Sequence, residues 1–337
     1  MTAQTQSALV TGAAGFIGYH LAAALLRQGW RVIGLDAMTD YYDVTLKQRR
    51  CAMLSQNKDF RFVEARVETP AMLNDLFAAE TPDVVVHLAA QAGVRYSIEN
   101  PESYVDANLV GTFRLLEAMR SYPPRHSLLA STSSVYGANA SMPYCEADKA
   151  DTQMSFYAAT KKANEAMAHS YAHLYDLPTT MFRFFTVYGP WGRPDMALFK
   201  FTRAILSGEP IDVYNHGNMS RDFTYIDDLI EGIVGLIDAV PNDASEIEGD
   251  SRSAVAPFRV VNIGNAEPVR LLDFIRAVEA ATGREAEMRM LPMQAGDVPA
   301  TWADTALLET LTGQRPGTSL QDGVGQFVSW FRKYYNC

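Results

Sequence analysis

Short apolar runs alternate with amphipathic stretches along the first 190 positions of the chain. The runs are apolar at nearly every position, as expected for strands that are covered on both faces. They predict strands at Ser7–Thr11, Arg31–Asp36, Phe60–Ala65, Asp83–Ala90, His126–Ser131 and Thr179–Phe185. Between them, helical periodicity predicts helices at Phe16–Gln28, Val105–Ser121 and Phe156–Tyr175. This order predicts an α/β protein with a doubly wound parallel sheet.

The alternation breaks after Tyr188, where glycine and proline dominate residues 189–194. Shorter elements follow, predicted as a helix at Ala197–Ser207, a strand at Ile211–Tyr214 and a final helix at Leu320–Tyr335. The polar stretch Pro241–Pro257 is predicted to be a surface loop. We therefore expect a smaller lobe beside the sheet, built from the C-terminal third.

Composition narrows the class of protein without pointing to its chemistry. The 337 residues suffice for about two folding units. A formal net charge of −10 disfavours nonspecific binding to nucleic acid or to an anionic membrane. Cys51, Cys145 and Cys337 lack the spacing of a metal site or a disulfide framework, and no apolar run is long enough to span a membrane. With no secretory pattern at Met1–Ser7, we expect a cytoplasmic protein without a bound metal.

The first candidate site is the glycine-rich segment Thr11–Gly18, between a predicted strand and a predicted helix. Gly12, Gly15 and Gly18 would let the backbone approach a pyrophosphate, and the helix N-terminus offers free N–H groups to an anion. The spacing is GxxGxxG rather than GxGxxG, so a plain strand-to-helix turn is an equal reading of the motif alone. Asp36 ends the second strand, where a carboxylate binds ribose hydroxyls and repels a 2′-phosphate, which favours NAD over NADP.

A second candidate site combines Tyr157 and Lys161, four residues apart on a predicted helix, with the hydroxyl-rich stretch Ser131–Ser134. A lysine ammonium close to a phenol favours the phenolate, which makes Tyr157 a usable general base for a substrate hydroxyl. Neither feature is specific alone, because Tyr and Lys at this spacing occur in many helices and hydroxyl-rich turns are common.

Together these motifs resemble those of the extended short-chain dehydrogenase/reductases, and among them the nucleotide-sugar epimerases and dehydratases, over nearly the whole chain. The resemblance implies a Rossmann-like NAD-binding domain, formed by residues 1–188 with 222–264. It implies a smaller C-terminal α/β lobe for the UDP-sugar, formed by residues 189–221 with 265–337, and a homodimer. It implies Thr132, Tyr157 and Lys161 as the catalytic residues. The NAD-binding positions that it implies are Gly12, Gly15, Phe16, Ile17, Gly18, Asp36, Leu88, Ala89, Ala90, Gln91, Asn108, Tyr157, Lys161, Phe184 and Val187.

Residues next to Thr132 separate the reactions of this family. Its dehydratases carry Asp-Glu directly after the catalytic threonine, and its UDP-glucuronate decarboxylases usually carry Glu two places after it. Here both positions are serines, Ser133 and Ser134. The stretches Arg183–Ala197 and Ala92–Ser97 resemble those of UDP-glucuronate 4-epimerases. Arg66 departs from the family, which usually has an adenine-binding Asp after the third strand.

We therefore expect reversible C4 epimerisation of UDP-glucuronate to UDP-galacturonate through a 4-keto intermediate. Hydride would be stored on bound NAD, and Tyr157 would act as general base and acid. A 4-epimerase of another UDP-sugar, or a UDP-glucuronate decarboxylase of the same fold, remains an alternative. The expected contacts of the UDP-hexuronate are Val94, Arg95, Ser133, Ser134, Thr186, Arg193, Ala197, Val213, Tyr214, Arg221 and Asp297.

Overall fold

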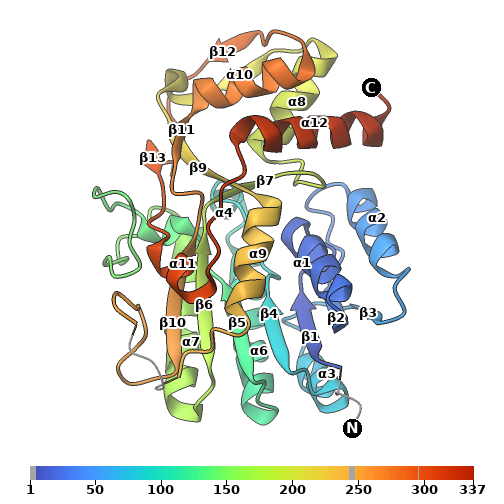
Figure 1. Ribbon diagram of the computed structural model, residues 1–337, viewed down its shortest axis with the longest axis vertical. Helices are drawn as coiled ribbons and strands as arrows, with labels where there is room; N and C mark the ends of the chain where they lie inside the picture. The colour runs from blue at the N-terminus through green and yellow to red at the C-terminus, as the bar shows by residue number, and fades with distance from the viewer. Residues whose placement is uncertain (1–4, 243–246, 295) are drawn as a thin grey trace.

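A parallel sheet forms the centre of the protein (Figure 1). The computed structural model describes residues 5–242, 247–294 and 296–337. Within them the sheet has seven strands in the order β10-β6-β5-β4-β1-β2-β3, and every neighbouring pair is parallel. The strands are β1 (Ser7–Thr11), β2 (Arg31–Asp36), β3 (Phe60–Glu64), β4 (Val84–His87), β5 (His126–Ala130), β6 (Thr179–Phe184) and β10 (Phe258–Ile263).

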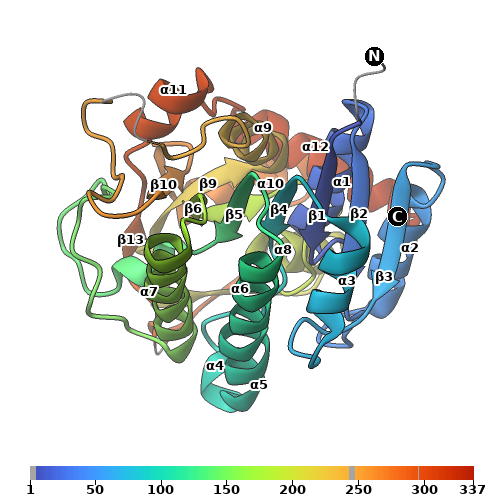
Figure 2. The same ribbon diagram turned by 90° about the horizontal axis from the view of Figure 1, so that it is seen from below.

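Helices cover both faces of this sheet, as Figure 2 shows. One face carries α3 (Met72–Glu80), α6 (Gly111–Ser121) and α7 (Phe156–Tyr175). The other carries α1 (Phe16–Arg27), α9 (Ile226–Leu236) and α11 (Ala306–Thr312), with α2 (Val44–Leu54) packed against α1. Two separate apolar clusters fill the two faces, which explains why the central strands are buried along their whole length. The predicted Rossmann-like α/β fold is confirmed.

A smaller lobe lies beyond the carboxyl ends of the strands (Figure 1). In it β9 (Ser220–Tyr225) pairs with β7 (Thr186–Tyr188), β11 (Pro268–Arg270) and β13 (Ala300–Thr301), and β8 (Ile211–Val213) pairs with β12 (Met288–Met290). The helices α8 (Ala197–Ser207), α10 (Leu271–Thr282) and α12 (Leu320–Tyr335) pack on this part. Ligands of such open sheets bind outside the carboxyl ends of the strands, so the lobe closes the place where a site is expected.

Two predicted elements differ from the observed ones by more than one residue at an end, for identifiable reasons. The strand expected at Asp83–Ala90 ends at His87, because the N–H groups of Leu88 and Ala89 turn to the side chain of Thr11, each at 3.1 Å from its hydroxyl oxygen. The helix expected at Val105–Ser121 starts with a π-helical turn over Val105–Val110, preceded by α4 (Tyr96–Glu99) and α5 (Glu102–Tyr104). Of the loop expected at Pro241–Pro257, residues 243–246 lie outside the described part.

Candidate active site

The glycine-rich loop joins β1 to α1 with no room for side chains. Gly12 has φ +74°, and a Cβ there would lie 2.9 Å from the backbone nitrogen of Ala89. A Cβ on Gly18 would lie 2.1 Å from the carbonyl oxygen of Gly12. Helix α1 has no side-chain cap at Gly15 and no acidic residue in its first turn. Its first N–H groups and its positive dipole end are thus available to bind an anion next to the loop.

Asp36 is held beside this loop at the end of β2. Its Oδ2 accepts a hydrogen bond from the Ala14 N–H (3.1 Å) and its Oδ1 accepts one from the Met38 N–H (2.8 Å). Both bonds orient a carboxylate whose remaining lone pairs can accept from two ribose hydroxyls. The tight loop, the uncapped helix and this carboxylate fit an adenine dinucleotide such as NAD.

One pocket connects these groups to the other candidate residues. The sequence-predicted residues in its wall are Gly12, Gly15, Phe16, Ile17, Gly18, Asp36, Leu88, Ala89, Ala90, Gln91, Tyr157, Lys161, Phe184 and Arg193. Asn108 and Val187 are buried without lining it. Asn108 instead holds Gln91: its Oδ1 accepts from the Gln91 N–H (2.8 Å), and its Nδ2 donates to the Gln91 carbonyl (3.1 Å). The π-helical turn places this asparagine, and such turns are frequent at functional sites.

Helix α7 presents Tyr157 and Lys161 to the pocket. The helix begins after Ser155, whose hydroxyl accepts from the Ala158 N–H (3.1 Å), so Tyr157 lies in the first turn and Lys161 one turn later. Thr132 follows the carboxyl end of β5, which points its side chain at the same region. The three expected catalytic residues are therefore brought together, all of them buried.

Burial dominates the proton affinities of these groups. It raises the pKa of the Tyr157 phenol, and contact with Thr132 and the charge of Arg193, rather than the expected Lys161, lower it. Burial also lowers the pKa of Lys161 to about 8, against the opposing charge of Glu165. His87, which contacts Thr11 and Thr112, has its pKa lowered to about 3 by burial and then by the charge of Lys161. It is therefore neutral at physiological pH.

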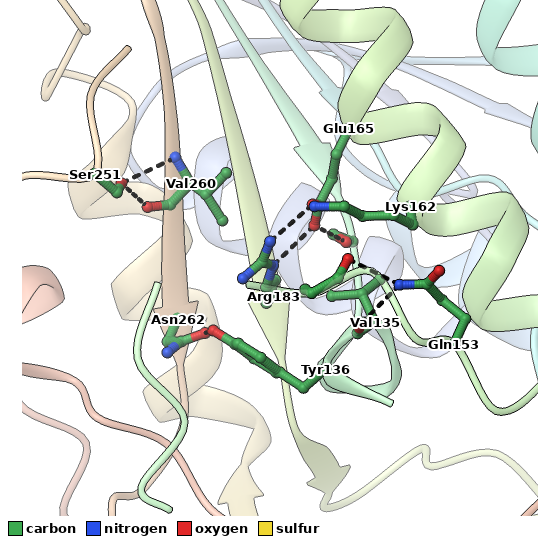
Figure 3. A network of polar contacts seen from close by, with 11 residues as sticks. Val135, Tyr136, Gln153, Lys162, Glu165, Arg183, Ser251, Val260 and Asn262 are labelled. Carbon is green, nitrogen blue, oxygen red and sulfur yellow. Dashed lines mark hydrogen bonds and ion pairs between the residues drawn. The ribbon is translucent and has the colours of Figure 1, made fainter. Parts of the chain in front are cut away.

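A buried polar network ties α7 to the neighbouring strands (Figure 3). The Glu165 carboxylate accepts two hydrogen bonds from Arg183 on β6, and it also contacts Lys162 (2.9 Å). The Ser131 hydroxyl donates to the same carboxylate at 2.6 Å. Because Ser131 directly precedes Thr132, this contact holds Thr132 in place relative to the helix that carries Tyr157.

A second group of expected residues meets between the sheet and the smaller lobe. The Asp297 carboxylate lies 3.7 Å from the guanidinium of Arg95 and 3.8 Å from that of Arg221. Arg95 also lies over the Tyr214 ring, 5.2 Å from its centroid. Val94 is the closest neighbour of a Cβ built on Gly296, and Val213 ends β8 directly before Tyr214. Two cations beside one carboxylate make this group suited to bind an anionic diphosphate.

The remaining expected substrate contacts lie in separate elements around this space. Ser133 and Ser134 form a 3₁₀ turn after Thr132, and the Ser134 N–H donates to the Thr132 hydroxyl oxygen (3.2 Å). Thr186 opens β7, and Ala197 opens α8. Arg193 lines the dinucleotide pocket, where Asp195 holds its guanidinium, rather than joining the cluster at Asp297.

Part of the pocket wall consists of residues that no sequence motif predicted. Tyr41, Tyr42 and Lys47, from the segment after β2, line the pocket close to Arg193. Lys47 donates to the carbonyl and the hydroxyl of Thr39, and burial lowers its pKa. Arg66 lines the same pocket near the end of β3. Among the described residues, no helix is long and apolar enough to cross a bilayer. In the same residues, no group of three or more histidine, cysteine, aspartate and glutamate side chains could hold a metal ion.

Known proteins resemble this chain in sequence over nearly its whole length. The profile of the NAD dependent epimerase/dehydratase family matches residues 8–264, so the chain belongs to that family. A probable UDP-glucuronate 4-epimerase of Rhizobium meliloti (strain 1021) is 57% identical over 97% of both chains. UDP-glucuronate 4-epimerase 4 of Arabidopsis thaliana is 47% identical over 97% of this chain and 76% of its own length.

A solved structure shares the fold over nearly the whole chain. The UDP-glucuronic acid 4-epimerase of Bacillus cereus, in complex with UDP-glucuronic acid and NAD, superposes with a TM-score of 0.88 at 34% identity. The match covers 98% of this chain and 100% of that one.

Proposed function

We propose that this protein is an NAD-dependent isomerase that interconverts UDP-glucuronate and UDP-galacturonate by epimerisation at C4. The observation that carries the proposal is that Tyr157 and Lys161 line the pocket formed by the glycine-rich loop and that Thr132 contacts the Tyr157 phenol. The relatives described above, with their names and their shared length, support the same activity.

The catalytic roles follow from the chemistry of each side chain. NAD, when bound in the pocket, would supply the hydride acceptor and donor for C4 of the sugar. The Tyr157 phenolic oxygen takes the proton of the sugar 4-hydroxyl and gives it back after the 4-keto sugar has turned over. Contact with Thr132 and the charge of Arg193 favour the Tyr157 phenolate against its burial, and the Thr132 hydroxyl orients the hydroxyl that reacts. Lys161, in the same pocket wall, would hold the nicotinamide ribose.

The absence of acidic side chains directly after Thr132 supports epimerisation over the alternatives. Elimination from the 4-keto sugar needs an acid and a base next to C5 and C6, and positions 133 and 134 offer only serine hydroxyls. These hydroxyls, with that of Thr186, suit a C5 carboxylate as neutral hydrogen-bond donors. This assignment favours a hexuronate over a neutral hexose.

We assign the UDP moiety to the cluster around Asp297. In this proposal Arg221 and Arg95 bind the diphosphate, Asp297 binds the uridine ribose, and Val213 and Tyr214 flank the uracil. Residues 1–188 with 222–264 then act as the NAD-binding domain, and residues 189–221 with 265–337 as the UDP-sugar domain. A cytoplasmic homodimer is part of the same proposal.

The test is incubation of the purified protein with UDP-glucuronate, without added NAD, followed by NMR. We expect UDP-galacturonate to accumulate to equilibrium, because the cofactor is regenerated in every cycle. Turnover of UDP-glucose without change of UDP-glucuronate would favour an epimerase of another sugar. A UDP-pentose as the main product would identify a decarboxylase instead.

A further inference from the structure

Arg50 is a buried arginine whose charge is not neutralised by a carboxylate. It lies on α2, and its side chain is fully buried. Its Nη1 donates to the carbonyl of Ala14 (3.0 Å) and to the hydroxyl of Tyr42 (3.0 Å). Its Nη2 donates to the carbonyls of Trp191 and Gly192. All four acceptors are neutral.

Other buried arginines in the described residues differ in this respect. Arg183 makes two hydrogen bonds to Glu165, and Arg259 makes two to Asp250, at 2.8 Å in each case. Across 5–242, 247–294 and 296–337, no carboxylate oxygen lies within 4.0 Å of the Arg50 guanidinium nitrogens. An uncompensated buried charge is costly, so its retention calls for an anion that the chain itself does not provide.

The charged groups near Arg50 do not supply the anion that would neutralise it. Lys47, one helical turn earlier, is also buried, and the pKa of Lys47 is lowered by burial and by the charges of Arg50 and Arg193, while Asp36 raises it. Asp36 is occupied by two backbone N–H groups, and Asp195 pairs with Arg193. An acidic protein thus places Lys47 and Arg193 in the wall of one pocket, with Arg50 buried behind it, and these charges complement the doubly charged pyrophosphate of a dinucleotide.

The hydrogen bonds of Arg50 connect two separate walls of this pocket. Ala14 belongs to the glycine-rich loop, whereas Trp191 and Gly192 directly precede Arg193. Both segments reach the pocket, through Gly12, Gly15 and Gly18 on one side and Arg193 on the other. A single guanidinium therefore bonds both the glycine-rich loop and the segment that precedes Arg193.

We propose that Arg50 is a positioning residue for the cofactor: its charge is neutralised by the pyrophosphate across the glycine-rich loop, and its bonds fix the segment that carries Arg193. The proposal rests on NAD binding, which is part of the proposed function, but not on the identity of the sugar. It can therefore fail while the epimerase activity stands, and it can hold if the substrate is another UDP-sugar.

The test compares three variants of the full chain by NAD binding in the absence of any sugar nucleotide. R50Q keeps hydrogen-bond donors without the charge, R50K keeps the charge with fewer donors, and R49Q removes an exposed charge from the adjacent position. The dissociation constant for NAD is measured at low and at moderate salt. We expect R50Q to weaken NAD binding roughly 10- to 100-fold, R50K to weaken it less, and R49Q to leave it unchanged.

Amide hydrogen exchange of residues 189–196 gives a second measurement. We expect NAD to slow this exchange in the wild-type protein and to leave it unchanged in R50Q. NAD affinity of R50Q within about twofold of wild type, or an equal loss in R49Q, would overturn the proposal. If R50Q does not fold, the folded R50K variant decides. Loss of NAD binding by R50K as severe as that of Gly18→Ala contradicts the charge argument, because R50K keeps the charge.

Discussion

Glu165 and Arg183 form an ion pair through two parallel hydrogen bonds, from Nε to Oε1 and from Nη2 to Oε2, each 2.8 Å long. Both side chains are buried. Burial alone would raise the pKa of Glu165, but the bonds and charge of Arg183, with Lys162 and Ser131, outweigh it and hold that pKa at about 2. The pair joins the helix of Tyr157 to β6, next to β5, the strand that precedes Thr132.

Replacing Glu165 by Gln should destabilise the protein strongly. The guanidinium of Arg183 would stay buried without its counter-charge, which typically costs ~3–5 kcal/mol. Urea unfolding at neutral pH measures the change. The double variant Glu165→Leu/Arg183→Met is the control, because removing both charges should recover most of the loss. A single variant as stable as wild type would contradict the argument.

The same substitution should shift the pH dependence of activity. Burial lowers the pKa of Lys161 to about 8 and the charge of Glu165 raises it, so without that charge the Lys161 ammonium loses its proton at a lower pH. The alkaline limb of kcat/KM should therefore move to lower pH in Glu165→Gln. Lys162→Gln, which removes a neighbouring charge outside the pocket wall, should leave Lys161 charged. An unchanged alkaline limb in Glu165→Gln would sink this prediction.

Glu146 should make stability fall as pH rises from about 4.5 to 7. Burial raises its pKa to about 7, although the N–H of Asn262 donates to it at 2.7 Å. The folded state therefore binds the proton more tightly than the unfolded state, and the resulting stabilisation disappears as pH rises through this window. Glu146→Gln keeps the acceptor without the charge, and should be more stable than wild type at pH 8 by roughly 1–3 kcal/mol.

At pH 4 the Glu146→Gln variant and the wild type should be alike, because Glu146 is then mostly protonated in both the folded and the unfolded states. Urea unfolding at the two pH values measures the difference. Glu285→Gln, an exposed carboxylate, is the matched control and should show no such pH dependence. Equal stabilities of Glu146→Gln and wild type at pH 8 would argue against a buried, perturbed carboxyl.

Gly18→Ala should abolish NAD binding. A methyl group there would lie 2.1 Å from the Gly12 carbonyl oxygen, so the loop must move away from α1. Overpacking of this kind costs ~1–3 kcal/mol. Gly325→Ala is the control: no atom lies within 4 Å of its added methyl, and the helix α12 should gain ~0.5–1 kcal/mol. The nucleotide content of the purified variants measures NAD binding, and thermal unfolding measures their stability. Full NAD content in Gly18→Ala would refute the prediction.

Tyr157→Phe should keep NAD bound and lose turnover by ~10²–10⁴-fold, because only the proton-transferring oxygen is removed. The comparison is Tyr171→Phe on the same helix, whose hydroxyl donates to Glu117 at 2.6 Å in a half-buried contact outside the pocket wall. That variant should remain active. Near wild-type turnover by Tyr157→Phe would mean that another group is the base.

The strands and long helices could be predicted because the spacing of apolar residues along the sequence follows their burial in the fold. The apolar runs predict both ends of β1 and β2 correctly, and helical periodicity predicts both ends of α7 and α12 correctly. The π-helical turn at Val105–Val110 could not be predicted, because the apolar pattern does not distinguish i→i+4 from i→i+5 hydrogen bonding. The placement of Asn108 depends on that turn.

The contribution of α2 to the pocket could not be predicted by searching for known motifs. A signal was nevertheless present: Leu46, Arg50 and Leu54 recur at four-residue intervals, which places an arginine in the apolar stripe of the helix. A charge in such a position is seldom tolerated without a partner. The electrostatics of Tyr157 were also beyond the sequence, because the balance between burial and neighbouring charges depends on the assembled fold.

The edge strand β10 has a consequence for the synthesis of the chain. It pairs with β6, but the ribosome makes the β8–β9 part of the smaller lobe between the two. Until Ile263 has emerged, β6 presents an open edge of unpaired backbone groups to other nascent chains. A message truncated after the sixth strand would therefore yield an aggregation-prone fragment rather than a smaller dinucleotide-binding protein.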